Sequence, residues 1–340
     1  MCFPCGVFAL GRMCKALMVN KLSGRVFGAL RNNRYLAPVM RRWALIVLLL
    51  VEVAARSQGR VMFWNLENFY DWRNDSTSVS DREFSSFGER HWTKKRFKAK
   101  CNAIAKTIMW ASGEGGWPEV IGVAEVENAF VLRMLIQTTA LRKMDYKIVH
   151  YDSPDPRGID VALLYRKSMC SLIDSKPCHI QGLSTRDILL AHFTDSKGED
   201  FAVLVNHHPS KYGGGASDDR RQVAVRRLGE LADSLKRVGI ERIIAMGDFN
   251  DTPDKPIFSG IGLYSLALPL HKKGMGSIKY DGKWELIDMF FSTDSTARMT
   301  IPQIPFLLTK DKTGQKPLRT YSGPRYLGGV SDHLPVWLER

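Results

Sequence analysis

Residues 242–251 read Arg-Ile-Ile-Ala-Met-Gly-Asp-Phe-Asn-Asp, and residues 331–336 read Ser-Asp-His-Leu-Pro-Val. In the first stretch a short apolar run ends at a glycine and is followed by two acids and an amide. In the second, an acid and a histidine stand directly before an apolar run. Short apolar runs bounded by Gly, Asp or Pro are typical of buried strands. Both stretches therefore predict polar side chains at the end of a buried strand.

The same arrangement recurs along the chain. Polar residues close predicted strands at 64–68 (Trp-Asn-Leu-Glu-Asn), at 124–128 (Ala-Glu-Val-Glu-Asn) and at 206–210 (Asn-His-His-Pro-Ser), and an Ile-Asp pair at 287–288 lies within a further strand. If these strand ends meet at one edge, they bring several carboxylates, two asparagines and two or three histidines into a single pocket.

Such a pocket has a definite chemistry. Carboxylates this close together repel one another and raise one another's pKa unless a cation lies among them. Oxygen ligands of this kind suit Mg²⁺, Mn²⁺ or Ca²⁺ better than Zn²⁺. Beside such a cation, an Asp that deprotonates water and an imidazolium that faces an anion are what phosphoester hydrolysis needs. Each motif alone is weak evidence, because Asx residues are common at strand ends.

The order of the motifs is more specific than any one of them. From about Val61 to Trp337 it resembles the endonuclease/exonuclease/phosphatase superfamily, which includes type I deoxyribonucleases, abasic-site endonucleases, neutral sphingomyelinases and inositol polyphosphate 5-phosphatases. The residues alone support an α/β fold. The resemblance implies a four-layer α-β-β-α sandwich of two packed, mainly antiparallel or mixed sheets with helices outside, and a metal-dependent phosphoesterase.

The resemblance also implies roles for individual residues. It assigns activation of the attacking water to Asp248 and a hydrogen bond to the scissile phosphate to Asn250. It assigns the phosphate-facing imidazole to His333, with Asp288 bonded to the far side of that ring. The metal ligands that it implies are Asn65, Glu67, Glu125 and Asp332. Glu127 is a weaker alternative to Glu125.

The chain departs from the family pattern at one point. Family members have a single histidine after the fifth strand, whereas this chain has His207 and His208. The spacing Asn-His-x-Pro-Ser favours His207, while relatives with Asn-x-His favour His208. We rank His207 first and expect the other ring to pack or to face solvent.

Three basic segments have a substrate-binding and a plain structural interpretation. Arg157 is a candidate for a bidentate phosphate contact, and an ion pair with Asp155 or Asp160 is the alternative. Lys211 stands before a Gly-rich segment that could contact phosphate, and a solvated loop is the alternative. The arginines of residues 220–227 are expected to form a solvated helix face.

Strands and helices alternate from residue 60 onward. Apolar periodicity predicts helices over 93–110 and 219–238 and, after a good N-cap at Asn128, a third that reaches Leu141. Residues 71–90 and 255–283 are expected to be surface loops. The predicted strands are Arg60–Leu66, Val120–Ala124, Tyr146–Tyr151, Ile159–Tyr165, Phe201–Asn206, Arg242–Met246, Leu286–Phe291 and Leu334–Leu338.

The first 57 residues differ in composition from the rest. They carry +8 of the net charge of +14, which leaves +6 for the other 283 residues. Within residues 40–57, Arg41 and Arg42 precede an apolar run from Trp43 to Val51, and small residues follow before Gln58, which is the order of a secretory signal peptide. The run is shorter than the ~20 residues that span a bilayer, so no retained membrane span is expected.

We therefore expect a leader over 1–57 and an exported catalytic domain over 58–340, in the periplasm or outside the cell. Residues 1–39 contain no acid, six basic residues and three of the six Cys. We interpret them as an over-extended start before Met40, and a long leader or an organellar transit segment is the alternative.

The remaining cysteines are Cys101, Cys170 and Cys178. In an exported protein, a pair between Cys170 and Cys178 would close a small loop. Cys101 falls on the apolar stripe of a predicted helix, which favours a buried thiol.

Composition excludes some classes and leaves the substrate open. With 44% apolar and 25% charged residues, and only six Cys, the chain is neither a disordered segment nor a disulfide scaffold. Nucleic acid is the first substrate, because positive charge favours a polyanion. A phosphomonoester or a phospholipid or sphingomyelin head group is the alternative, and a non-catalytic binding protein on the same fold is the competing class. No stable protein partner is expected.

Cleavage of the leader can be tested directly. N-terminal sequencing of the exported product should begin near Gln58, because the small residues before it match a signal-peptidase site. Any other start would contradict the predicted cleavage.

Overall fold

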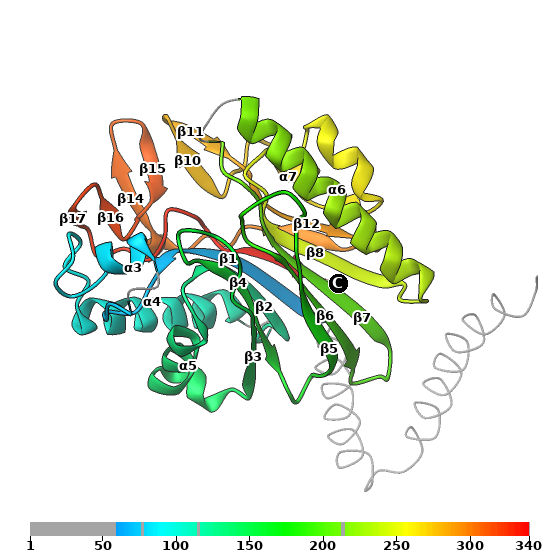
Figure 1. Ribbon diagram of the computed structural model, residues 1–340, viewed down its shortest axis with the longest axis horizontal. Coiled ribbons are helices and arrows are strands. Elements are labelled where there is room, and N and C mark those ends of the chain that lie inside the picture. Colours follow the sequence, from blue (N-terminus) through cyan, green and yellow to red (C-terminus); the bar gives the residue numbers. More distant parts are fainter. Residues whose placement is uncertain (1–58, 76–77, 114–115, 212–214, 340) are drawn as a thin grey trace, which may run out of the picture. The chain divides into compact units, whose positions relative to one another are not determined.

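Two six-stranded sheets form the centre of the protein (Figure 1). The computed structural model describes residues 59–75, 78–113, 116–211 and 215–339, and the predicted leader lies outside these described residues. The first sheet has the order β13-β18-β1-β2-β4-β3, and the second has the order β5-β6-β7-β8-β12-β9. The strands of the first are β1 (Arg60–Phe69), β2 (Val120–Val126), β3 (Tyr146–His150), β4 (Asp160–Arg166), β13 (Arg298–Thr300) and β18 (Val336–Glu339). Those of the second are β5 (Cys170–Cys178), β6 (Ile188–Asp195), β7 (Asp200–His207), β8 (Arg242–Asp248), β9 (Tyr264–Ser265) and β12 (Asp288–Ser292).

Helices cover the outer faces of the two sheets. Figure 1 shows α4 and α5 on the outer side of the first sheet, and α6 and α7 on the outer side of the second. Between the sheets, β1 contacts β8 and β4 contacts β7. The expected four-layer α-β-β-α sandwich is confirmed. The helices are α3 (Val79–Glu83), α4 (Lys94–Ser112), α5 (Ala129–Thr138), α6 (Gly215–Arg237) and α7 (Leu268–His271), with 3₁₀ turns η3 (Ala140–Lys143), η4 (Pro256–Ile261) and η5 (Pro305–Leu307).

Three small hairpins stand beside the sheets. They pair β10 (Ile278–Tyr280) with β11 (Lys283–Glu285), β14 (Leu308–Asp311) with β15 (Gly314–Pro317), and β16 (Tyr321–Ser322) with β17 (Arg325–Tyr326). The last of these hairpins lies between Arg319 and Asp332 in the sequence, so it separates two residues that belong to the site described below.

Each sheet contains a parallel pair, β1 with β2 and β7 with β8, and the other pairs are antiparallel. Parallel neighbours need a crossover connection. The segment that contains α4 supplies it in the first sheet, and α6 supplies it in the second. The carboxyl ends of β1 and β2 therefore lie side by side, as do those of β7 and β8, and these ends carry the predicted site residues.

The helices form where the sequence predicts them. The Thr93 hydroxyl accepts from the Arg96 N–H at the start of α4, and the Asn128 side chain accepts from two N–H groups at the start of α5. The apolar stripe of α4 is buried, and this includes Cys101, whose predicted burial is confirmed. All eight predicted strands are present within a few residues of the expected bounds.

The sequence analysis missed β5 and β6. The run Ile188–Asp195 is largely apolar and was a readable strand signal, whereas β5 is half-exposed and polar, as expected for an edge strand. The two expected surface loops also contain short elements: α3 lies within residues 71–90, and η4, β9, α7 and β10 lie within 255–283.

A disulfide between Cys170 and Cys178 is excluded. These residues are the first and last of β5, eight residues apart on one strand. An extended strand rises about 3.3 Å per residue, so their Cα atoms lie roughly 26 Å apart. A disulfide needs Cα atoms within about 7 Å. The small loop that the pairing required is instead a strand.

None of the described helices has the length and apolar content needed to cross a membrane.

A substitution at Gly247 tests how closely β7 and β8 approach each other beside the site. A Cβ at this position would lie 2.3 Å from the Asn206 carbonyl oxygen, which is backbone and cannot rotate away. We expect Gly247→Ala to lower the free energy of unfolding by about 2 kcal/mol, measured by urea denaturation. The control is Gly260→Ala, where a Cβ meets no atom within 4 Å. Equal stability of the two variants would contradict this close approach.

Candidate active site

The side-chain amide of Asn65 links the two sheets at the site. Its nitrogen lies 3.0 Å from Asp248 Oδ2, at the end of β8, and 3.4 Å from Glu125 Oε1, near the end of β2. Its oxygen accepts the N–H of Glu67 at 2.9 Å. Asn65 and Asp248 are almost fully buried. One amide therefore sets the positions of two acids that come from different sheets.

Unusual backbone conformations gather at these strand ends. Glu67, Asn68, Glu125 and Asn250 have φ between 47° and 59°, and they make up four of the six non-glycine residues with positive φ in the described part of the chain. The pairing of β1 with β2 also shifts register after Asn65. Left-handed φ costs free energy in residues with a Cβ, and it is found mainly where function requires it. Here it turns the strand ends so that their polar side chains face one another.

His333 and Asp288 form a buried pair. Nδ1 of His333 lies 2.7 Å from Asp288 Oδ2, which also accepts from the Ser277 hydroxyl at 2.5 Å. Burial disfavours the imidazolium, but the charges of Asp288 and Asp248 outweigh it and hold the pKa of His333 well above its usual value. His333 is therefore a cation near neutral pH, and its Nε2 is directed toward Asp248.

Asp248 lies at the centre of the cluster. Its Oδ2 is 3.8 Å from His333 Nε2 and 3.7 Å from His207 Nε2, and its Oδ1 accepts the Asn250 N–H at 3.0 Å. Burial raises the pKa of Asp248 to about 7, although the charge of His333 acts in the opposite direction. A carboxylate with this pKa can take up a proton near neutral pH, which a general base must do.

The two adjacent histidines have different surroundings. His207 lines the cavity, and its Nε2 approaches both Asp248 and, at 4.0 Å, Glu125. Burial, then Arg186 and Arg157, place its pKa well below the usual value, so the ring is neutral. His208 lies behind the cavity, with its ring edge-on to Phe249 at 4.8 Å.

Three acids surround a second cation. The Arg319 guanidinium lies 3.1 Å from Glu67 Oε1 and 3.0 Å from Asp332 Oδ2, and the charges of these acids and of Glu125 raise its pKa. Burial and the charge of Asp332 raise the pKa of Glu67 to about 7. Burial favours protonation of Glu125, but Arg157 and the Asn68 N–H hold its pKa below the usual value.

The donor set here fits a hard divalent cation. It consists of carboxylate oxygens from Glu67, Glu125 and Asp332, which are the ligand type that Mg²⁺ prefers. These three carboxylates already stabilise the positive charge of Arg319. The Asn65 amide, also a predicted ligand, presents its nitrogen to Glu125 and its oxygen to the Glu67 N–H. The group Asp248, Asp288 and His333 also offers ligand atoms within 4.8 Å of one another. There, however, the imidazole and Asp288 already satisfy each other, which suits acid–base chemistry better than metal binding.

The cavity beside these residues has a volume of about 260 Å³. It is lined by Glu125, His207, Asp248, Asn250 and His333 among others. The structure thus brings Glu125, Asp248, His207, Asn250 and His333 together at one cavity. Asp288 is bonded to His333, and Glu67 and Asp332 share Arg319.

Three arginines also line the cavity, namely Arg157, Arg186 and Arg220. The Arg157 side chain contacts Asn68 Oδ1 at 3.0 Å and Glu125 at 3.7 Å, so the alternative of a side-chain ion pair with Asp155 or Asp160 is wrong.

Six predicted site residues do not line the cavity. Asn65, Glu67, Asp288 and Asp332 lie beside it and contact its lining residues or Arg319. His208 and Lys211 have other surroundings. His208 is behind the wall, and Lys211 pairs with Glu285 at 2.6 Å and is absent from the lining residues. The expectation of a solvated face for residues 220–227 is wrong in part: Arg220 lines the cavity, and Arg221 is buried against Asp218 and Asp251.

Sequence reasoning missed Lys100, Arg186 and Arg319. Lys100 is fully buried in α4, where its ammonium donates to the Glu67 carbonyl and to Thr320, and burial lowers its pKa to about 8. A lysine on the apolar stripe of a predicted helix, between Phe97 and Cys101, was a usable signal. Nothing in the sequence marks the other two.

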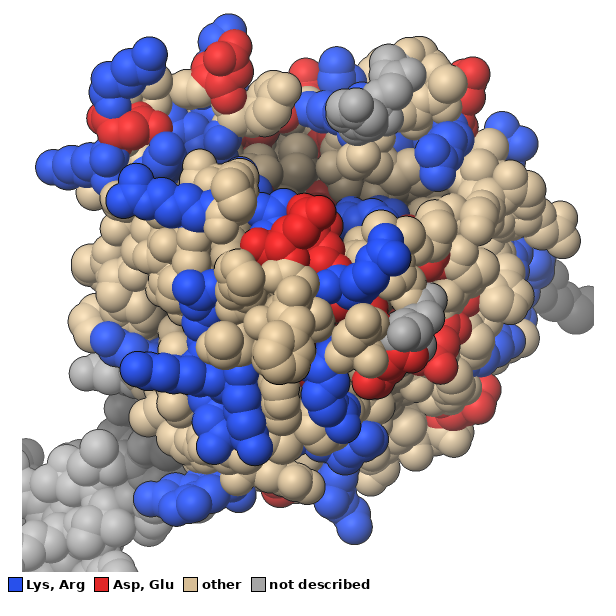
Figure 2. Space-filling view, turned by 60° about the vertical axis from the view of Figure 1, so that its left-hand side comes forward, with Lys and Arg blue, Asp and Glu red and all other residues tan. Residues whose placement is uncertain are grey.

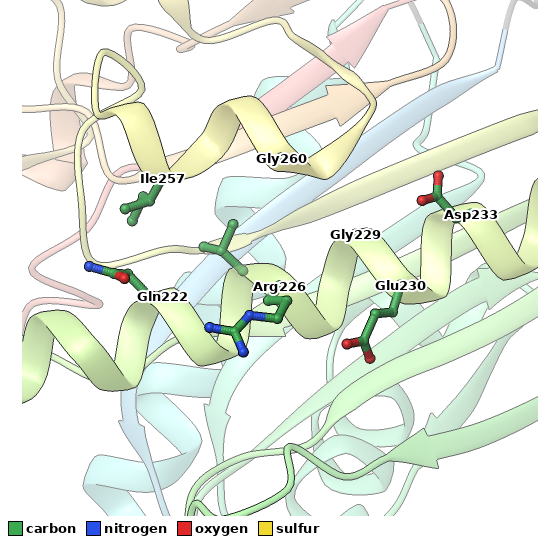
Figure 3. Close-up of a pocket in the computed structure, with 8 residues that line it drawn as sticks. Gln222, Arg226, Gly229, Glu230, Asp233, Ile257 and Gly260 are labelled. Carbon is green, nitrogen blue, oxygen red and sulfur yellow. The ribbon is translucent and has the colours of Figure 1, made fainter.

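A larger cavity, of about 350 Å³, lies between α6 and η4 (Figure 3). Gly229 and Gly260 are among its lining residues, and a Cβ at Gly229 would lie 2.8 Å from the Gly260 carbonyl oxygen. Its lining holds Arg226, Glu230 and Asp233 but none of the matched residues. We therefore place the active site at the smaller cavity.

The class of protein follows from this fold and this cluster. A family model described as the endonuclease/exonuclease/phosphatase family matches residues 60–340. The chain belongs to this family.

Solved structures share the fold at low sequence identity. The human Nocturnin catalytic domain with bound sulfate has a TM-score of 0.53 at 15% identity, covering 83% of this chain and 93% of that one. A mannosyl-6-phosphatase of Bacteroides thetaiotaomicron has a TM-score of 0.53 at 14% identity, covering 83% of this chain and 99% of that one. D. rerio TDP2 complexed with a single-strand DNA product has a TM-score of 0.50 at 15% identity, covering 83% of this chain and 98% of that one. No curated protein sequence matches the chain.

The lowered pKa of the buried His208 predicts that the free energy of unfolding depends on pH. Burial lowers its folded-state pKa to about 3, below the unfolded value of about 6.5. Between these values the unfolded chain binds the extra proton, so stability is lost as pH falls below about 6.5, by up to about 1.4 kcal/mol per pH unit. Urea denaturation at pH 7.5 and 5.5 should show a smaller loss for His208→Gln than for the unsubstituted protein. Equal losses would contradict the assignment.

Proposed function

We propose that this protein is a divalent-metal-dependent phosphodiesterase that cleaves nucleic acid with a water molecule activated at Asp248. The observation that carries the proposal is the buried group Asp248, His333 and Asp288. It combines a carboxylate whose pKa is about 7 with an imidazolium fixed by a second carboxylate.

Each of these side chains has a place in the reaction. Asp248 accepts the proton of the attacking water, and Asn65 and the Asn250 N–H hold the carboxylate in position. His333 directs Nε2–H toward the phosphoryl oxygens, where negative charge develops. Asp288 keeps that ring charged and oriented. When bound, a divalent cation at Glu67, Glu125 and Asp332 supplies charge neutralisation at the phosphate.

Charge supports nucleic acid as the substrate. The segment after residue 57 carries +6, and Lys and Arg side chains are spread widely over the face shown in Figure 2. Neutralisation of backbone phosphates is the main source of affinity for nucleic acid. The TDP2 structure of the same fold holds a single-strand DNA product.

A phosphomonoesterase is the second candidate. The cavity of about 260 Å³ is small, and three arginines line it, which suits a terminal phosphate. A structure of the same fold is a mannosyl-6-phosphatase. Export is part of the proposal as well, and it rests on the signal-peptide pattern of residues 40–57.

Plasmid cleavage tests the proposal. Residues 58–340 should nick supercoiled plasmid in Mg²⁺ and not in EDTA, measured by loss of the supercoiled band. Asp248→Asn should lower the rate at least about 10²-fold, because the general base is lost, with little change in melting temperature. The matched control is Asp254→Asn, an exposed acid of the same loop that pairs with His271.

The other outcomes separate the candidates. Absence of nicking together with metal-dependent release of phosphate from a phosphomonoester would replace the nuclease by the phosphatase. Equal rates for Asp248→Asn and the unsubstituted protein would contradict both.

A further inference from the structure

We propose that Arg157, Arg186 and Arg220 form a second anion subsite, which binds a phosphate group next to the one being cleaved. This rests on the proposed phosphoesterase function, and it adds a substrate class: ligands with two neighbouring phosphates.

The three arginines come from separate parts of the fold. Arg157 lies in the connection between β3 and β4, Arg186 lies in the connection between β5 and β6, and Arg220 lies on α6. All three line the cavity that holds Asp248 and His333. Their convergence therefore depends on the tertiary structure and places three positive charges within one small volume beside the scissile position.

Arg186 is the fixed member of the group. It is 7% exposed, and its guanidinium donates to Asp155 Oδ2 at 2.8 Å and to the His208 carbonyl at 2.7 Å. Its Nε has no hydrogen-bond partner among the described residues. Burying a guanidinium is costly, and here one carboxylate and one carbonyl hold it at the wall of a polar cavity. An anion in the cavity would offset that cost.

Arg157 and Arg220 are the adaptable members. The Arg157 side chain is 44% exposed and reaches toward Asn68 and Glu125 with one of its terminal nitrogens. Arg220 is exposed, and no acid in the described residues lies within ion-pair distance of it, whereas its neighbour Arg221 is buried against two acids. Both can therefore turn to a ligand without breaking a buried ion pair.

The charge balance of this wall favours a ligand anion. Besides the catalytic Asp248 and the candidate metal ligand Glu125, the lining acid is Asp155. Asp155 accepts from Arg186 and from the Arg157 N–H, so it neutralises one guanidinium of the three. Glu125 lies 3.7 Å from Arg157 and offsets part of a second charge. Arg220 has no acid within ion-pair distance among the described residues, so its charge remains for a phosphate, which arginine binds through paired N–H donors.

The residues that line the cavity also indicate whether the subsite recognises bases. Among the described residues the lining includes no Phe, Tyr or Trp side chain, so this part of the wall offers no aromatic platform on which a base could stack. The subsite should therefore select phosphate spacing and not base identity. A nucleoside 3′,5′-bisphosphate is a small ligand that carries two phosphates at the spacing of a nucleic-acid strand.

Calorimetry with small ligands tests the subsite. The protein with Asp248→Asn, in Mg²⁺, is titrated with deoxythymidine 3′,5′-bisphosphate and with the 3′- and 5′-monophosphates. The bisphosphate should bind at least about tenfold more tightly than either monophosphate, as expected for one charge-assisted contact. Adding Arg220→Gln should reduce this preference at least about fivefold and leave the tighter monophosphate unchanged. Arg226→Gln, six residues along α6 and outside this cavity, is the matched control and should change neither.

The outcomes distinguish the subsite from the function on which it rests. Equal binding of bisphosphate and monophosphates, or an equal loss of both with Arg220→Gln, overturns the subsite even if plasmid is cleaved. A bisphosphate preference that depends on Arg220, without plasmid cleavage, supports the subsite and overturns the nuclease.

Discussion

The hydrogen bonds of Asn65 are the interaction on which the rest of the site depends. One amide nitrogen lies within hydrogen-bond reach of Asp248 in the second sheet and of Glu125 in the first, and the amide oxygen holds the Glu67 N–H. Without these contacts, the two buried carboxylates would lose the N–H donor that lies within hydrogen-bond reach of both, and the His207 Nε2, at 3.7 and 4.0 Å, would be the nearest group to both. Burial makes such an arrangement unfavourable, because unpaired polar groups in a dry interior cost several kcal/mol. The Asn65 amide therefore joins the two sheets and links Asp248 to the candidate metal ligand Glu125.

Burial then separates the roles of the acids. Asp248 and Glu67 have raised pKa values, whereas the pKa of Glu125 is lowered because Arg157 and a backbone N–H outweigh its burial. His333 and His207 diverge in the same way: two acids hold the first ring charged, and burial together with nearby arginines keeps the second neutral. Groups of the same type thus acquire different protonation states from their surroundings, as acid–base catalysis requires.

Four arginines lie in or beside the cavity. Arg319 lies among the candidate metal ligands, while Arg157, Arg186 and Arg220 line the cavity. These cations offset the negative charge of the carboxylates in and around the cavity.

The sequence by itself determined the α/β class, eight strands, the main helices and the order of the polar motifs, because short apolar runs and helical periodicity are local signals. It also singled out Asn65, Asp248, Asp288 and His333, since each lies at or within a strand whose pattern is readable. Arg186, Arg220 and Arg319 could not be found in this way. They lie in loops and on a helix face, far from the motifs in sequence, and only the packing of the two sheets places them at the cavity. The same is true of the two adjacent histidines: their order suggested one of them, but the neighbour's contact with Phe249 and the Nε2 distance to Asp248 come from the tertiary structure. Local pattern decides which elements form, whereas long-range contacts decide which charges meet, and the chemistry depends on the latter.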